Sequence, residues 1–290
     1  MASRDGLAAL SLLWCMQQAL ILFFGQLASR FDQFQAVLVA GTVLTGAWPP
    51  VLCAALAARI YANSYAVFPN AWESLYWCAQ TDVAILLSLL VQMRRSSTLT
   101  IFPDQRADAV HDAIKVMRWQ IASWYLSAAF FKINSSFLDH RYSCASPYVA
   151  QLLAAYLPSS LSFDELAPLV AFAPAMVLTG EAALSLALLC CAAGRGGRLM
   201  APLGVGLACL LHFMIAITPP PNNIGAFSVI MVARLPAFVP PDALASALSF
   251  PRTGGEAMGI AVTGLVAAVA TEAAARATAA GGAGSAASGG

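Results

Sequence analysis

The runs LAPLVAFAPAMVLTGEAALSLALLCCAA (residues 166–193) and LMAPLGVGLACLLHFMIAIT (residues 199–218) decide the fold class of this chain. A helix needs about 20 apolar residues to cross a hydrocarbon core roughly 30 Å thick, and each run supplies that length. Glu181 and His212 are the only acidic, basic or histidine side chains within them. The two runs therefore predict membrane-spanning helices, joined by the short basic loop at 194–198.

The overall composition supports the same conclusion. Of 290 residues, 60% are hydrophobic and only 10% are charged, whereas soluble domains carry about 25% charged residues. Lipid accepts apolar side chains on the outside of a helical protein, which water does not. The formal net charge of +1 gives no field that would attract nucleic acid. We therefore predict an all-α, polytopic transmembrane helical bundle of about seven to nine helices, a multi-pass integral membrane protein with the lipid bilayer as its partner.

Further apolar runs extend the pattern along the chain. We interpret the first as a retained helix, because no small-x-small cleavage site follows it. The second run is broken in two by Trp-Pro-Pro at 48–50, since proline removes an amide donor and restricts the residue before it. The runs cover residues 7–28, 34–65, 72–93, 110–131, 224–239 and a weaker, alanine-rich 256–275.

Polar and low-complexity segments set the boundaries. The stretch 134–163 contains Ser, Asp, His, Arg and Pro, so we expect a long loop outside lipid. Residues 1–245 then form one transmembrane domain, and 246–278 form an extra alanine-rich C-terminal helix. The tail at 279–290 has nothing to pack and is expected to be disordered.

Basic loops predict the orientation. Two short loops carry arginines: Arg94, Arg95 and Arg106 in one, Arg195 and Arg198 in the other. Two spans separate these loops, so both lie on one side, which the positive-inside rule makes cytoplasmic. The 134–163 loop and the turn at 219–223 then face the opposite side.

Ionisable side chains at membrane depth are costly and are the first candidates for function. Lys132 ends the 110–131 run. It is either a lysine that snorkels to the interface or a partly desolvated amine that acts as a base. Arg118, Tyr125 and Lys132 are spaced by seven residues, so they share one helix face.

A lysine that acts as a base must be able to lose its proton, and a carboxylate beside it would oppose this. We therefore expect Lys132 to lie in an aromatic pocket, without an acidic partner, among Phe130, Phe131 and Phe137. We also expect it to converge on one cavity at the non-cytoplasmic side with His212, Asn222, Asn223 and the Trp72–Glu73 end of the 72–93 run.

Three other intramembrane polar residues leave alternatives open. Glu181 is either paired with a basic group for structure or part of a proton path. Asp82 pairs with Arg118 or only caps a polar seam. His212 is a hydrogen-bonded packing residue or a proton-transfer group. The aromatic side chains near them, Tyr125 included, suit interface anchoring, core packing or contact with a flat apolar ring such as a quinone.

Motifs for other chemistries do not occur. The chain has no Walker loop, dinucleotide glycine pattern, CxxC or HExxH, and its seven cysteines form no zinc or disulfide pattern. His140 and Cys144 make a poor metal site, because two candidate ligands in a loop are too few. We expect no metal.

An ordered set of segments resembles the membrane (HTTM) domain of vitamin K-dependent gamma-carboxylase and its microbial relatives. The clearest part is RWQ at 118–120, followed by Tyr125 and FKINSSF at 131–137. The second part is LHF at 211–213, followed by NIGAFS at 223–228 and MVA at 231–233, and Trp72 is a looser third match. In order and spacing the resemblance covers roughly residues 1–245.

The resemblance implies a lumenal or periplasmic active site, where a lysine deprotonates reduced vitamin K, or another quinol, to start oxygen-driven carboxylation of glutamate. Lys132 matches the base and His212 a family histidine, while Trp72, Tyr125 and Asn223 are implied substrate-binding residues. The sequence departs from the family at two positions: Phe131 replaces a second lysine of the animal enzymes, and Leu75 replaces an expected histidine. The large domain that follows in the full carboxylase is absent from these residues, so we do not expect peptide carboxylation by them alone.

Two functions from different classes follow. The chain either oxidises a lipid-soluble quinol with Lys132 as base, or is a non-catalytic membrane module for assembly, lipid binding or transport. Retention of Lys132 favours the first, and Leu75 in place of histidine favours the second. Fold alone does not decide between them.

Overall fold

The computed structural model describes residues 6–24, 30–66, 73–157, 162–195, 197–219 and 225–240, and within these ranges every regular element is a helix. This confirms the all-α class. Trp72, Asn222 and Asn223 lie outside the described residues, as do the predicted helix at 246–278 and the tail at 279–290.

The N-terminal helices follow the predicted runs closely. They are α1 (Gly6–Phe24), α2 (Arg30–Leu44) and α3 (Pro49–Tyr61), which continues into the π-helical turn η1 (Ala62–Ala66). The break between α2 and α3 falls where the proline pair predicts it. Pro49 starts α3 at a position that needs no amide donor, and Gly46 and Ala47 make the tight turn with positive φ angles of 61°.

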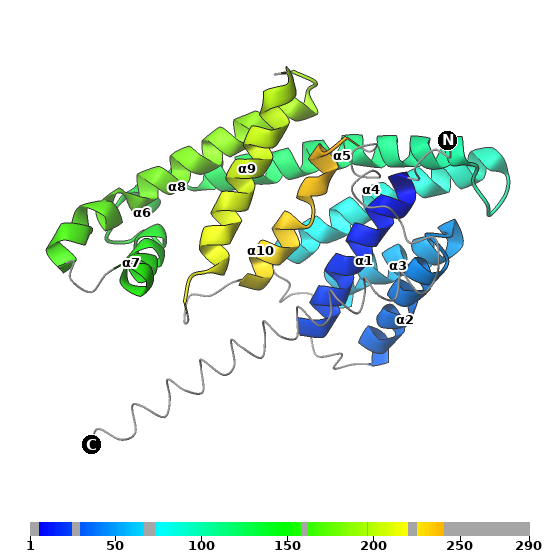
Figure 1. Ribbon diagram of the computed structural model, residues 1–290, viewed down its shortest axis with the longest axis horizontal. Helices are drawn as coiled ribbons and strands as arrows, with labels where there is room; N and C mark the ends of the chain where they lie inside the picture. Colours follow the sequence, from blue (N-terminus) through cyan, green and yellow to red (C-terminus); the bar gives the residue numbers. More distant parts are fainter. Residues whose placement is uncertain are drawn as a thin grey trace.

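Two long helices form the middle of the molecule. Helix α4 covers Glu73–Ser96 and α5 covers Pro103–Phe131. Helix α5 begins earlier than the predicted run at 110–131. Pro103 occupies its first turn, and the backbone N–H of Phe102 donates to Gln105 Oε1 at 2.9 Å. In Figure 1, α5 runs along the long axis, and α4 lies next to it.

The prediction of a loop at 134–163 is wrong, because this region contains two helices. They are α6 (Ser135–Leu138) and α7 (Ala145–Tyr156). Asn134 caps α6 by accepting a hydrogen bond from the Phe137 backbone at 2.8 Å. Phe137 and Ala145 pack against Ala173. Many of the polar residues lie between the two helices. Because the prediction rested on the polar residues of the whole stretch, it missed the apolar face of α7.

The C-terminal part of the described fold is a set of packed helices. These are α8 (Phe163–Ala192), α9 (Gly197–Ala216), α10 (Gly225–Val232) and the 3-10 turn η2 (Leu235–Phe238). A Cβ added at Gly204 would lie 2.6 Å from Leu188 Cδ2, so glycine allows α8 and α9 to approach closely. Helix α10 lies between α9 and α1 (Figure 1).

Several polar side chains lie inside the bundle while large apolar ones lie on its surface. In α4, Asp82 is fully buried, whereas Leu87 is 55% exposed. In α9, His212 is 1% exposed and the adjacent Phe213 is 58% exposed. Three helices of the described residues are long and apolar enough to cross a membrane: Ser74–Ser96, Asp164–Ala192 and Leu199–Ala216. Their buried apolar residues, such as Leu89 and Leu188, form the rest of the interior.

Candidate functional site

Lys132 and Glu181 form an ion pair between α5 and α8. The Lys132 ammonium lies 2.8 Å from Oε1 and 2.7 Å from Oε2 of Glu181, so it donates to both carboxylate oxygens. Lys132 is the residue that caps the C-terminus of α5, where a positive charge also interacts favourably with the helix dipole. Its side chain is 25% exposed and that of Glu181 is 9% exposed.

The expectation that Lys132 has no acidic partner is therefore wrong. Of the expected aromatic pocket only Phe137 is present, with its ring centroid 5.8 Å from the ammonium. Phe130 and Phe131 point outward and are strongly exposed. The physical reason is the charge on α8: Glu181, buried alone, would be very costly, and Lys132 is long enough to reach it. Of the alternatives for Glu181, pairing with a basic group is what the structure shows.

Tyr125 and His212 form a second polar pair on the same face of α5. The Tyr125 hydroxyl lies 2.7 Å from His212 Nε2, and both side chains are buried. The His212 ring also packs against Phe227 of α10, with centroids 5.4 Å apart. His212 Nδ1 has no hydrogen-bond partner among the described residues. The contact fixes the imidazole between α5 and α10 and leaves one of its nitrogens unengaged.

Asp82 does not pair with Arg118, contrary to one of the two expectations. Its Oδ1 accepts from Arg234 Nη2 at 3.0 Å and from Trp14 Nε1 at 2.9 Å. Arg118 instead donates to the carbonyl of Ala237 at 2.7 Å. Both arginines thus hold the C-terminal part of the described chain, because one binds η2 and the other lies just before it.

Arg234 is a buried charge that the sequence analysis missed. It lies within the apolar run 224–239, where it was counted as part of a span. A lone arginine inside a predicted span is itself the missing signal, because such a charge requires an internal partner. Trp14 was overlooked for a different reason: an indole N–H in an apolar helix carries no visible pattern until its acceptor is known.

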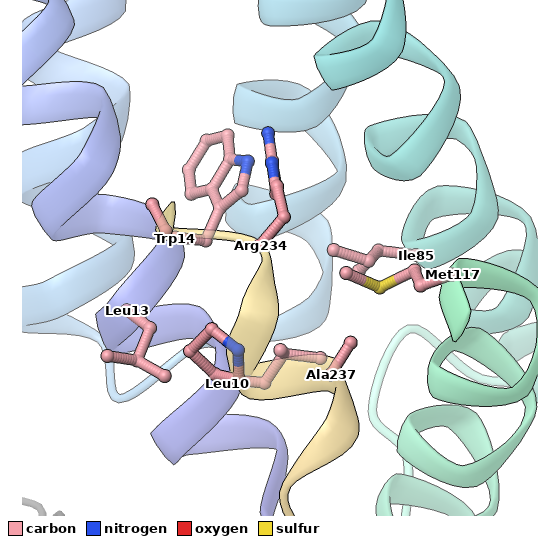
Figure 2. Close-up of a pocket in the computed structure, with 9 residues that line it drawn as sticks. Leu10, Leu13, Trp14, Ile85, Met117, Arg234 and Ala237 are labelled. Atoms are coloured by element: carbon pink, nitrogen blue, oxygen red, sulfur yellow. The ribbon is translucent and has the colours of Figure 1, made fainter. Parts of the chain in front are cut away.

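The structure describes only some of the residues that we expect around one cavity. Trp72, Asn222 and Asn223 lie outside the described residues. Lys132 and Tyr125 lie on one face of α5, each with its own partner. A cavity is present elsewhere, among α1, α4, α5 and the segment around η2, and its lining includes Trp14 and Arg234 but not Lys132, Tyr125 or His212 (Figure 2).

The chain matches no protein-family model, no curated protein and no solved structure. What the geometry defines is a class: a helical protein that has, within the described residues, three helices long and apolar enough to cross a membrane, with paired polar side chains among them. Lys132–Glu181 and Tyr125–His212 are two such pairs along one face of α5.

Proposed function

We propose that this chain is a multi-pass integral membrane protein, with a bundle of about seven to nine spans. The length and hydropathy of α4, α8 and α9 support this proposal, as do the buried polar side chains Asp82, Glu181 and His212 within them. Ser97 and Ser136 are exposed and flank α5 at its two ends. In sealed vesicles, Ser97→Cys and Ser136→Cys should react with an impermeant thiol reagent from opposite sides. Reaction from the same side would overturn the arrangement.

We further propose that the site oxidises a lipid-soluble quinol, such as reduced vitamin K, after removing a proton at the Lys132–Glu181 pair. The observation that carries this proposal is the pair itself, placed at the end of α5 beside exposed aromatic residues. A quinol ring that approaches from lipid meets Phe130 and Phe131, both strongly exposed. The ammonium next to them is in place to stabilise the oxyanion that forms on deprotonation.

The ion pair changes which group accepts the proton. An ammonium has no lone pair, so while the pair is charged the acceptor is the Glu181 carboxylate. Lys132 becomes a base only after its own proton moves to Glu181. Either route leaves one quinol proton on the pair. The quinol anion then passes two electrons and its remaining proton to dioxygen, which the resemblance implies as the oxidant, and the proton held by the pair completes hydrogen peroxide and leaves the quinone.

Quinol oxidation by purified protein in nanodiscs tests this proposal. Lys132→Ala and Glu181→Gln should each lower the rate by about a hundredfold, as loss of a general acid–base group does. Lys115→Ala is the matched control, because Lys115 is the other lysine of the chain and is exposed on α5. Equal rates for the wild type and Lys132→Ala would overturn the proposal.

Lys132→Arg separates the two routes. A guanidinium keeps the ion pair but stays protonated and cannot act as a base. Loss of activity in this variant assigns the proton to Lys132. Retained activity, together with loss in Glu181→Gln, assigns it to Glu181.

A second candidate is a non-catalytic membrane module for assembly, lipid binding or transport. The observation that favours it is the closed geometry of the ion pair, in which both Glu181 oxygens already accept from Lys132. In that case Lys132→Ala and Glu181→Gln lower stability, and purified protein neither binds nor oxidises a quinol.

A further inference from the structure

One face of α1 is polar although the helix is otherwise strongly apolar. Ser11, Trp14 and Gln18 are spaced three and four residues apart, so they lie on the same side of the helix, and Gln17 flanks them. All four side chains are buried. The helix therefore directs these polar groups inward, to a depth where each needs a hydrogen-bond partner.

The facing side of α4 is polar as well. Ser74, Cys78 and Asp82 are buried and recur every four residues, so they line one helix face. Trp14 donates to Asp82, and Gln17 Nε2 lies 3.5 Å from Cys78 Sγ. We call the polar residues of these two faces, together with the arginine that pairs with Asp82, the α1–α4 seam.

Much of the hydrogen-bonding capacity of the seam has no partner among the described residues. The unpartnered atoms are Ser11 Oγ, Gln17 Oε1, both amide atoms of Gln18, Ser74 Oγ, Asp82 Oδ2 and Arg234 Nε. Buried polar groups in proteins are nearly always satisfied, and ordered water is the usual partner where side chains offer none. Because these atoms lie along two helix faces joined by the Trp14–Asp82 and Gln17–Cys78 contacts, ordered water between the faces can serve them.

A cavity adjoins the seam beside Arg234. About 10 Å³ of it is open to water, room for about one molecule, and Trp14, Arg234, Ile85 and Met117 are among the residues that line it. Figure 2 shows the Trp14 and Arg234 side chains next to each other, with Ile85 and Met117 across the gap. Trp14 and Arg234 both donate to Asp82 Oδ1, so the cavity lies next to the Asp82–Arg234 ion pair of the seam.

We propose that the α1–α4 seam is a water-binding path inside the membrane bundle, filled through the cavity beside Arg234, with Asp82 Oδ2 as its main acceptor. The proposal concerns α1, α4 and Arg234 and does not depend on quinol chemistry at Lys132.

Thiol oxidation tests the path, because hydrogen peroxide is close to water in size and oxidises the thiolate, which needs contact with water to form. Cys78 lies in the seam, while the equally buried Cys15 has its thiol against the Val39 carbonyl of α2. In nanodiscs, with the remaining cysteines replaced by alanine, Cys78 should react faster than Cys15 by about tenfold or more.

Two introduced cysteines extend the comparison. Ser74→Cys places a thiol in the seam, and Ala208→Cys places one in the apolar core on α9, where the native residue is fully buried. The first should react at a rate close to that of Cys78 and the second as slowly as Cys15. If Cys78 and Ser74→Cys are no faster than both controls, the seam is dry and the proposal falls.

Gln18→Leu gives an independent result. In a hydrated seam, leucine displaces water, so Cys78 reactivity falls severalfold and the midpoint of unfolding does not rise. In a dry seam, the same change removes two unsatisfied amide atoms. The midpoint would then rise and Cys78 would stay unreactive, which contradicts the proposal.

Discussion

The Asp82–Arg234 and Lys132–Glu181 ion pairs have similar lengths but different surroundings. Arg234 and Asp82 are 3% and 0% exposed, and Trp14 donates a second hydrogen bond to the same carboxylate oxygen. Lys132 and Glu181 are 25% and 9% exposed, at the end of α5. Removing one partner leaves a fully buried charge in the first pair, whereas Lys132 of the second pair is partly exposed and stays open to solvent when Glu181 is replaced. Burial, more than distance, distinguishes the two pairs.

The largest effect is expected from breaking the fully buried pair. Arg234→Met should destabilise the fold by about 3–5 kcal/mol, because it leaves Asp82 buried without a counter-charge. The measurement is the midpoint of denaturant unfolding in detergent micelles, followed by tryptophan fluorescence.

A double variant is the control for this prediction. Asp82→Leu combined with Arg234→Met should recover most of the loss, because replacing a whole buried pair by apolar residues is often neutral. If Arg234→Met is no more damaging than Lys132→Met, the contrast between the two pairs is incorrect.

A smaller effect is expected from the partly exposed pair. In a double-mutant cycle of Lys132→Met and Glu181→Gln, the coupling free energy should be about 1–2 kcal/mol, because Glu181 is buried but solvent screens the partly exposed charge of Lys132. Lys115→Met is the matched control and should leave the midpoint unchanged. A coupling as large as that of Asp82 with Arg234 would show that Lys132 is as deeply enclosed as Arg234.

The helices were largely predictable because their signals are local. Apolar length locates α8 and α9, and the proline pair locates the break before α3. Helix α5 begins earlier than predicted because its first turns are polar and outside the apolar run, although Pro103 is a start signal that could have been used. Helix α7 was missed because its apolar face is short and lies within a polar stretch.

The site was less predictable, because its partners come from different helices. The cost of a buried carboxylate indicates that Glu181 needs a basic group, but only the packing of α5 on α8 selects Lys132. For the same reason, Arg118 on the next helix was one of two alternatives for Asp82, while its actual partner Arg234 follows about 150 residues later. Seven-residue spacing correctly places Tyr125 and Lys132 on one face but does not reveal what that face contacts.

The smallest effect is expected from an exposed pair, Asp139 and Arg141, in the turn between α6 and α7. Arg141 Nη2 lies 2.6 Å from Asp139 Oδ2, with side chains 69% and 27% exposed. The hydrogen bonds from Arg141 lower the pKa of Asp139 from 3.8 to about 2. Because the pKa is lower in the folded state, the stabilisation is present above about pH 4 and is lost as the pH falls towards 2.

The Asp139→Asn variant should therefore show a slightly smaller fall of its unfolding midpoint between pH 4 and pH 2 than the wild type. Asp108→Asn, at another exposed aspartate, should leave this pH dependence unchanged. High salt should shrink the difference, because exposed charges are screened. If the midpoint of the Asp139→Asn variant depends on pH in the same way as that of the wild type, the pair contributes nothing to the stability of the fold. The contribution of an ion pair to stability would then fall to zero when both partners are exposed.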